Sequence, residues 1–222
     1  MQLNSLDTFK HNNDAPSFKA GQDAAVLTSI YDDQVNMAIW QRQHQKVLDR
    51  YAQEWVKQHQ SHTPRIILSA DKVLDQLDEL LPNIEHKNEF KQDVALLVDM
   101  FSCLFDAEEI GLRLAPLTKA MCPRFHVDNI PCRLITTYGG LGTEWLLEEN
   151  VNRDYLGRGA KGLPDSESGI IQGDKTIQQV SSQQVALLKG SGWIGNEKYG
   201  LVHRSPALSP GQSRLLLTLD FS

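Results

Sequence analysis

The sequence predicts an α+β protein with helices in its first half and a β-rich second half. Apolar residues recur at helical spacing before about residue 110, whereas short apolar runs between Gly, Pro and Ser turns dominate from Gly111 onward. Many short strands separated by turn signals are typical of a sandwich, a barrel or a jelly roll. We therefore expect one compact domain in three parts: a mobile tail over 1–20, a mainly helical layer over 21–110 and a β core over 111–222.

The first half is expected to hold short strands as well as helices. Val35, Met37 and Ile39 alternate with polar residues, which predicts a strand. Apolar stripes at helical spacing predict three helices, and Pro82 ends the second of them. In chain order we expect a strand over 35–40, a helix over 43–59, a strand over 66–68, a helix over 73–81 with Ser69 as its N-cap, and a helix over 88–105.

The second half is expected to consist of strands, with the helices packed on one outer face of them. A Gly- and charge-rich stretch, roughly 150–174, interrupts the pattern, and its length suggests a lid over a binding site or an insertion without a role. The expected strands lie over 112–114, 124–128, 133–138, 143–147, 177–180, 185–188, 200–203 and 214–221.

The composition argues against several classes of partner. The chain carries 22 Lys and Arg against 28 Asp and Glu, a formal net charge of −6, and has no Lys/Arg-rich run. Nucleic acid is therefore not favoured, although a local basic groove remains compatible with these totals. No apolar run approaches the roughly 18–20 residues that a membrane span needs.

The N-terminus and the cysteines predict a reducing compartment. The first residues lack the charged start and the apolar core of a signal peptide. Three cysteines, Cys103, Cys122 and Cys132, are odd in number and too few for a disulfide framework. We expect a cytoplasmic protein.

Two histidines and one aspartate form the strongest chemical signal in the chain. His126 and Asp128 are two residues apart on a predicted strand, so their side chains would project to the same side. His203 is the only other histidine in the β-rich half. Two imidazoles and one carboxylate can hold Fe(II) on one face and leave the other coordination positions open. We expect these three residues to bind one metal ion.

Arg214 opens the last predicted strand, among apolar residues. A guanidinium in such a place needs an anionic partner, and a carboxylate offers the best bidentate match. One candidate partner is a side chain of the protein, such as Asp220 or Glu144; the other is an anionic co-substrate.

The order of these residues resembles the signature of the Fe(II)/2-oxoglutarate-dependent dioxygenases. In their prolyl-hydroxylase-like branch, the His-x-Asp strand leads into a strand that carries an arginine and a tyrosine, as Arg133 and Tyr138 do here. In that branch a glycine-containing turn and a Gly-x-Thr-x-aromatic segment follow, and the corresponding stretch here is Gly139-Gly140-Leu141-Gly142-Thr143-Glu144-Trp145. At the level of longer segments, MCPRFHVDN, RLITTYGGLGTEWL and GLVHRSPALSPGQSRLLLTLDF are similar to a bacterial family called domain of unknown function 1826, which brings no established activity.

The dioxygenase resemblance implies a fold, cofactors and roles for particular residues. The fold would be a double-stranded β-helix, also called a jelly roll. His126, Asp128 and His203 would bind Fe(II), Arg214 would bind the distal carboxylate of 2-oxoglutarate, and Tyr138 or Thr136 would assist. The reaction would use 2-oxoglutarate and O₂ to hydroxylate an unidentified substrate, either a small molecule or a protein side chain.

Other readings of the same residues stay open. The three ligands could serve a non-catalytic buffer or sensor for zinc or another divalent ion, or a cupin-type isomerase or lyase. Cys122 has the same strand parity as His126, so a zinc site with a thiolate ligand is also conceivable. Arg204 is expected to point away from the metal as a surface or rim charge, and Trp145 and Trp193 are expected to be core or rim aromatics.

Overall fold

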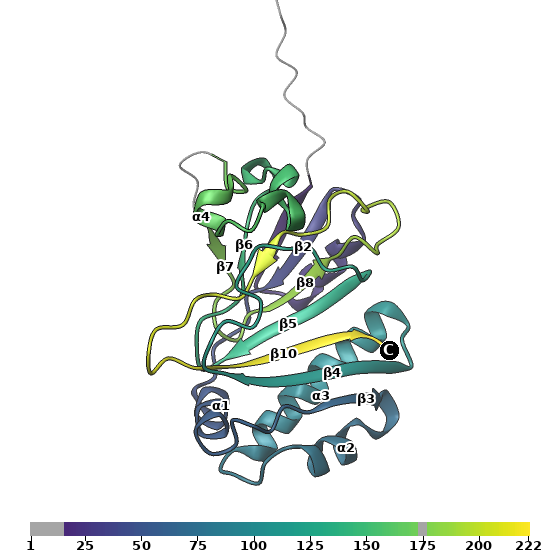
Figure 1. Cartoon of the computed structure of the whole chain (residues 1–222). Coiled ribbons are helices and arrows are strands. Elements are labelled where there is room, and N and C mark those ends of the chain that lie inside the picture. Colours follow the sequence, from purple (N-terminus) through teal and green to yellow (C-terminus); the bar gives the residue numbers. More distant parts are fainter. Residues whose placement is uncertain (1–15, 173–176) are drawn as a thin grey trace, which may run out of the picture.

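The computed structural model describes residues 16–172 and 177–222, which form two β-sheets with helices against the larger one (Figure 1). The larger sheet has seven strands, and all neighbours in it are antiparallel except β1 and β2. In spatial order these strands are β1 (Ser17–Gly21), β2 (Val35–Trp40), β8 (Val185–Lys189), β5 (Cys132–Tyr138), β10 (Arg214–Phe221), β4 (Glu109–Leu117) and β3 (Arg65–Ser69).

The smaller sheet is short and antiparallel. Its strands, in spatial order, are β7 (Gln178–Gln179), β6 (Glu144–Trp145) and β9 (His203–Arg204). An isolated bridge between His126 and His203 adds the segment around His126 to the free side of β9. The smaller sheet therefore gains a fourth, very short neighbour.

Three helices pack on one face of the larger sheet: α1 (Lys46–Gln58), α2 (Val73–Leu80) and α3 (Lys87–Phe105). Each buries an apolar stripe, as Leu48, Tyr51 and Trp55 do in α1. Together with the sheet they enclose the main hydrophobic core. Among the described residues, no helix has the length and apolarity to cross a membrane.

Shorter helical turns connect the other elements. Before β2 lies η1 (Ala24–Tyr31), and η2 (Ala70–Lys72) leads into α2. Ser69 precedes η2, and its side chain makes no capping hydrogen bond. Residues 148–168 hold η3 (Glu148–Asn150), η4 (Arg153–Tyr155), η5 (Gly157–Ala160) and α4 (Asp165–Ser168).

The prediction of an α+β protein is confirmed, as are the three main helices and the strands at 35–40, 133–138 and 214–221. Strands β1 to β3 come from the first half of the chain and join the same sheet as the strands of the second half. Both halves therefore share one sheet, and the segment expected as a helical layer also supplies three strands.

Besides the N-cap at Ser69 and the strand over 200–203, of which only His203 lies in β9, two local predictions are wrong. Residues 1–15 of the predicted tail lie outside the described residues, but Ser17–Gly21 form a strand that pairs with β2. This edge strand is short and mostly exposed, so the apolar residues Phe18 and Ala20 give only a weak strand signal. The predicted strand over 124–128 is reduced to the single bridge at His126. The neighbouring Phe125 N–H donates to the carboxylate of Asp165, not to a strand.

The two faces of the larger sheet have different roles. On β10, Leu215, Leu217 and Leu219 belong to the core beneath the helices. Alternate residues point the other way, so Arg214, Leu216 and Thr218 lie on the opposite face. On that face a second apolar cluster, which includes Ile135 and Trp145, joins the larger sheet to the smaller one. The site described below lies on this second face.

Candidate metal centre

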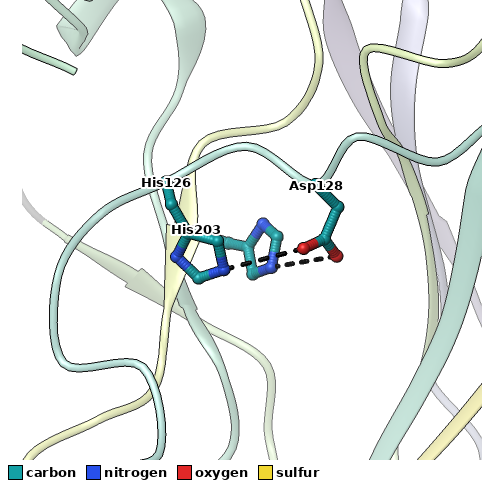
Figure 2. Close-up of side chains that lie close together, drawn as sticks. All are labelled: His126, Asp128 and His203. Carbon is teal, nitrogen blue, oxygen red and sulfur yellow. Dashed lines mark ion pairs between the residues drawn. The ribbon is translucent and has the colours of Figure 1, made fainter. Parts of the chain in front are cut away.

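His126, Asp128 and His203 come together where the smaller sheet meets the segment between β4 and β5. The backbones of His126 and His203 exchange two hydrogen bonds, each 3.0 Å long. This pairing sets the two imidazoles side by side, with ring centroids 4.5 Å apart. Asp128, two residues after His126, directs its carboxylate toward both rings (Figure 2). The structure thus assembles the three residues that the sequence singled out.

The spacing of their polar atoms leaves room for an ion. His126 Nε2 lies 3.7 Å from Asp128 Oδ1, and His203 Nε2 lies 3.6 Å from Asp128 Oδ2. These separations are too long for hydrogen bonds. One ligand atom from each residue lies within 4.8 Å of the others, and among the described residues this is the one group of its kind. Such a triangle of atoms matches the facial arrangement that a divalent metal takes with two histidines and a carboxylate.

Backbone carbonyls fix the orientation of both histidines. His126 Nδ1 lies 2.9 Å from the carbonyl oxygen of Arg124, and His203 Nδ1 lies 3.1 Å from that of Leu201. A carbonyl oxygen only accepts, so each Nδ1 must carry the proton and donate it. Each Nε2 is then left with a free lone pair directed toward Asp128. This is the arrangement that commonly orients histidine ligands of metals.

Asp128 is held by an arginine that the sequence analysis did not assign to the site. Arg133 Nη1 donates to Asp128 Oδ2 at 2.7 Å. The same guanidinium makes two hydrogen bonds to Asp220, at 2.6 and 2.9 Å. Arg133 on β5 and Asp220 on β10 therefore anchor Asp128 to the larger sheet. Strand parity could have identified Arg133 from the sequence, because Arg133 and Ile135 are two residues apart on β5 and point to the same face.

Burial keeps His203 neutral. Desolvation lowers the pKa of His203 to about 4, although the nearby Asp128 carboxylate acts in the opposite direction and His126 adds to the lowering. His203 is only 7% exposed. At neutral pH the side chain is thus in the form that a metal ion requires.

This pKa shift predicts acid sensitivity of the metal-free protein. Between pH 6.5 and about 4 the unfolded chain binds a proton at His203 that the folded chain does not. The contribution of this group to stability is therefore complete above pH 6.5 and is lost as the pH falls below it. We expect the free energy of unfolding to drop by on the order of 2 kcal/mol between pH 6.5 and 5 from this group.

Urea unfolding of the metal-free protein at several pH values would measure this drop. His203→Gln removes the titrating group, so the variant should show a shallower pH dependence over the same range. An identical pH dependence in wild type and variant would contradict the assignment of the shift to His203.

A small cavity of about 120 Å³ adjoins the three residues. Strands from both sheets contribute to its wall, through Ile135 on β5, Leu216 and Thr218 on β10, and Thr143 next to β6. Cys122 also lines the cavity, but its sulfur is not part of the cluster of ligand atoms. Space for a small ligand therefore exists beside the candidate metal position.

Arg214 lies behind this cavity, in a buried position. The side chain is 1% exposed, and among the described residues no carboxylate forms an ion pair with it. Nη1 donates to the Leu141 carbonyl at 3.1 Å, Nη2 donates to Ser205 Oγ at 3.0 Å, and the buried Nε has no partner. Desolvation lowers its pKa to about 10. The proposed salt bridges to Asp220 or Glu144 are absent because Arg133 and Arg204 occupy those carboxylates.

Tyr138 and Thr136 do not reach the site, which corrects the roles expected for them. They share the parity of Cys132 and Leu134 on β5, and those residues face the helices. The Tyr138 hydroxyl donates to Asp93 on α3 at 2.6 Å, and Asp93 is also paired with Arg42. Burial raises the pKa of Tyr138 well above its usual value. Tyr138 is thus part of a buried network under the helices.

Tyr138→Phe should therefore destabilise the fold and leave the candidate metal centre unaffected. Loss of a hydrogen bond to a buried carboxylate is expected to lower the free energy of unfolding by about 2 kcal/mol. Urea unfolding and Fe(II) titration would measure the two effects separately. Tyr155→Phe, at a partly exposed position, is the matched control and should change neither quantity. A loss of Fe(II) affinity in Tyr138→Phe would contradict this placement.

Other residues named from the sequence have structural partners. Arg204 is ion-paired with Glu144 and Asp165 at 2.7 Å each, and its guanidinium lies over the Phe125 ring. Arg204 therefore forms part of the cavity wall and is not an unpaired surface charge. Trp145 is buried between the sheets and Trp193 packs against the main core, as expected of core or rim aromatics.

The stretch expected as a lid or an insertion is described from 150 to 172. Val151 and Ile170 in it pack with Phe125 and Val202 in a separate apolar cluster. Asp165 accepts hydrogen bonds from Phe125 N–H and from Arg204, which ties α4 to both histidine segments. This stretch thus covers the outer side of the candidate centre.

Comparison with solved structures shows which known proteins the chain is similar to in fold. The chain is similar to dioxygenase for auxin oxidation 1 from Arabidopsis thaliana in complex with 2-oxoglutarate, with a TM-score of 0.53 at 8% identity, over 93% of this chain and 92% of that one. Weaker similarity extends to a Pseudomonas putida prolyl-4-hydroxylase (TM-score 0.44, 13% identity, 90% and 99% covered). A 2-oxoglutarate–Fe(II) oxygenase family protein from Burkholderia pseudomallei gives a TM-score of 0.40 at 9% identity, with 93% and 94% covered.

The family is shown by the sequence itself. Residues 21–220 match the model of the family "Protein of unknown function (DUF1826)", and the chain belongs to this family. No curated protein sequence matches the chain.

Proposed function

We propose that this protein is an Fe(II)/2-oxoglutarate-dependent oxygenase that hydroxylates a small organic substrate. The observation that carries this proposal is the convergence of His126 Nε2, His203 Nε2 and the Asp128 carboxylate on one point beside a cavity. Bound Fe(II) and 2-oxoglutarate would supply the oxidising chemistry with O₂. The residues of the chain bind, orient and shield these groups.

The strand order supports a double-stranded β-helix as the scaffold. Among the described residues from Glu109 onward, eight extended segments belong to the two sheets: β4, the His126 segment, β5, β6, β7, β8, β9 and β10. They alternate between sheets as 1-8-3-6 in the larger sheet and 2-7-4-5 in the smaller one. This order is the one expected of a jelly roll, in which two facing sheets can hold a ligand between them, and it supports that scaffold. The likeness to the plant dioxygenase supports the same assignment.

The donor set suits iron. Two neutral imidazole nitrogens and one carboxylate leave positions for a bidentate co-substrate and for O₂. The carbonyls of Arg124 and Leu201 keep both Nε2 atoms available, and Arg133 orients Asp128. The sulfur of Cys122 lies outside the ligand cluster, so a zinc–thiolate site has less support.

Arg214 is proposed to bind the distal carboxylate of 2-oxoglutarate. It is a buried cation that has no ion pair and no partner for Nε within the part of the chain that the structure describes, so an anion would be stabilising there. Ser205 Oγ lines the cavity and accepts from this guanidinium. Rotation of the Ser205 side chain would expose Arg214 to the co-substrate. Thr143, also in the cavity wall, replaces Tyr138 and Thr136 as the candidate for an assisting hydroxyl.

Anaerobic titration of the metal-free protein with Fe(II) and then 2-oxoglutarate tests this function. A bidentate Fe(II)–2-oxoglutarate chelate produces a weak visible charge-transfer band, which we expect in wild type and not in His203→Ala. If Fe(II) binds and no band appears, the oxygenase proposal is wrong. A zinc competition would then test the non-catalytic metal-binding function.

A further inference from the structure

A larger cavity of about 430 Å³ adjoins the candidate metal centre on the same face of the sheet. Arg113, Arg133 and Thr218 line both this cavity and the smaller one, so the two spaces meet. Because Gly111 has no side chain between Ile67 and Asp220, the floor of the cavity stays open there. We call this space the arginine groove. Its volume is in the range of small-molecule sites.

Two arginines in the groove have unmatched charges. Arg65 on β3 and Arg113 on β4 are directly opposite each other in the sheet. Among the described residues, neither guanidinium forms an ion pair, and the buried Nε of Arg113 has no hydrogen-bond partner. The third groove arginine, Arg133, is neutralised by Asp128 and Asp220. The groove is therefore locally positive in a chain whose net charge is −6.

This arrangement is unfavourable without a ligand. Like charges directly across two strands destabilise a sheet. Burial and the neighbouring Arg65 both lower the pKa of Arg113, because the low dielectric and the nearby positive charge each disfavour its protonated form. Charge on an edge strand discourages aggregation, which would account for the exposed Arg65. It would not account for the partly buried Arg113 or its unpartnered Nε.

We propose that the arginine groove binds the acidic group of a small organic acid, and that this acid is the substrate. Two adjacent guanidiniums match the oxygens of a carboxylate or a phosphate. Ile67 and Met121 offer apolar contacts for the hydrocarbon part of such a molecule. An acid bound at Arg113 would extend from the arginine groove past the residues that both cavities share, and so reach the metal position. The identity of the substrate thus rests on the proposed oxygenase function, whereas the anion site does not.

Nuclear magnetic resonance of the arginine Nε–Hε groups tests the anion site. The metal-free full chain is titrated with inorganic phosphate and, separately, with acetate. We expect saturable shifts of the Arg65 and Arg113 signals, which are assigned from Arg65→Gln and Arg113→Gln. The anion with the higher affinity distinguishes a phosphate from a carboxylate substrate.

Variants determine whether the binding belongs to the groove. Arg113→Gln should weaken binding at least about tenfold, because a charged pair of hydrogen bonds is lost. Gly111→Val keeps both charges but fills the floor of the groove, so it should also weaken binding. The substitution should not strain the backbone, because Gly111 is not in the left-handed region and an added Cβ meets only ordinary contacts. Arg50→Gln, an exposed arginine on α1, is the matched control and should change nothing.

Several outcomes would overturn the proposal. One is the absence of saturable shifts at Arg113, and another is equal affinity in wild type and Arg113→Gln. Loss of binding in Arg214→Met but not in Arg113→Gln would assign the anion to the co-substrate position instead. His203→Ala should bind the anion within twofold of wild type, so failure of the iron proposal would leave this result intact.

Discussion

Asp128→Ala should abolish tight Fe(II) binding and leave the fold intact. The carboxylate is the only anionic ligand of the candidate centre, and two imidazoles alone hold Fe(II) weakly. We expect the Fe(II) affinity to fall by at least about 100-fold. Loss of a residue that merely orients a metal ligand can already cost up to about that much, and loss of a ligand should cost no less. Arg133 keeps its two hydrogen bonds to Asp220, so no buried cation is left unpaired. Anaerobic calorimetric titration with Fe(II) measures the loss.

Asp154→Ala provides the matched control, because this aspartate lies in η4 away from the ligand cluster and should not alter Fe(II) affinity. Circular dichroism and urea unfolding establish that both variants fold. Undiminished Fe(II) binding in a folded Asp128→Ala protein would remove Asp128 from the centre.

Arg214→Met should abolish 2-oxoglutarate binding without the instability usual for a buried substitution. The arginine is a cation in an apolar place, no carboxylate among the described residues forms an ion pair with it, and desolvation lowers its pKa to about 10. Replacing a poorly compensated buried charge with an apolar side chain of similar length is often neutral or stabilising. We expect the free energy of unfolding of the ligand-free protein to be unchanged or higher by up to about 2 kcal/mol.

Co-substrate affinity is measured by the same charge-transfer titration. In Arg214→Met, 2-oxoglutarate affinity should fall by at least about 100-fold, whereas Fe(II) affinity stays within a few-fold of wild type. An equal loss of both affinities would point to a structural role for Arg214. Lower stability with normal 2-oxoglutarate binding would also contradict the proposal. If substitution of a residue stabilises the protein but abolishes ligand binding, the residue serves binding at a cost in stability.

The residues of the candidate centre were predictable because their signals are local or nearly so. His126 and Asp128 share a side because they are two residues apart in extended chain, even though the predicted strand is only a bridge. His203 followed from being the one other histidine in the β-rich half. Arg214 was recognised as a cation in an apolar strand, and in the structure it is buried, with no ion pair to any carboxylate of residues 16–172 or 177–222.

The positions of Tyr138 and Thr136 could not be predicted from the sequence alone. Strand β5 is buried on both faces, since helices cover one side and the smaller sheet the other. A strand of this kind has no apolar–polar alternation to show which side chains face the site. The resemblance placed a tyrosine on the right strand, but the face was decided by Asp93 on α3, 45 residues earlier in the chain.

The sequence by itself therefore determined the class of fold, the main helices and strands, and the three candidate metal ligands. Spacing along the chain is sufficient for these, because periodicity and side-chain parity are local properties of the backbone. Tertiary structure decided how Arg133 holds Asp128, that Arg214 has no acidic partner among the described residues, and that Arg65 lies opposite Arg113 beside the candidate metal centre. These depend on which strands become neighbours, and strand pairing joins residues whose separation in sequence carries no signal of contact.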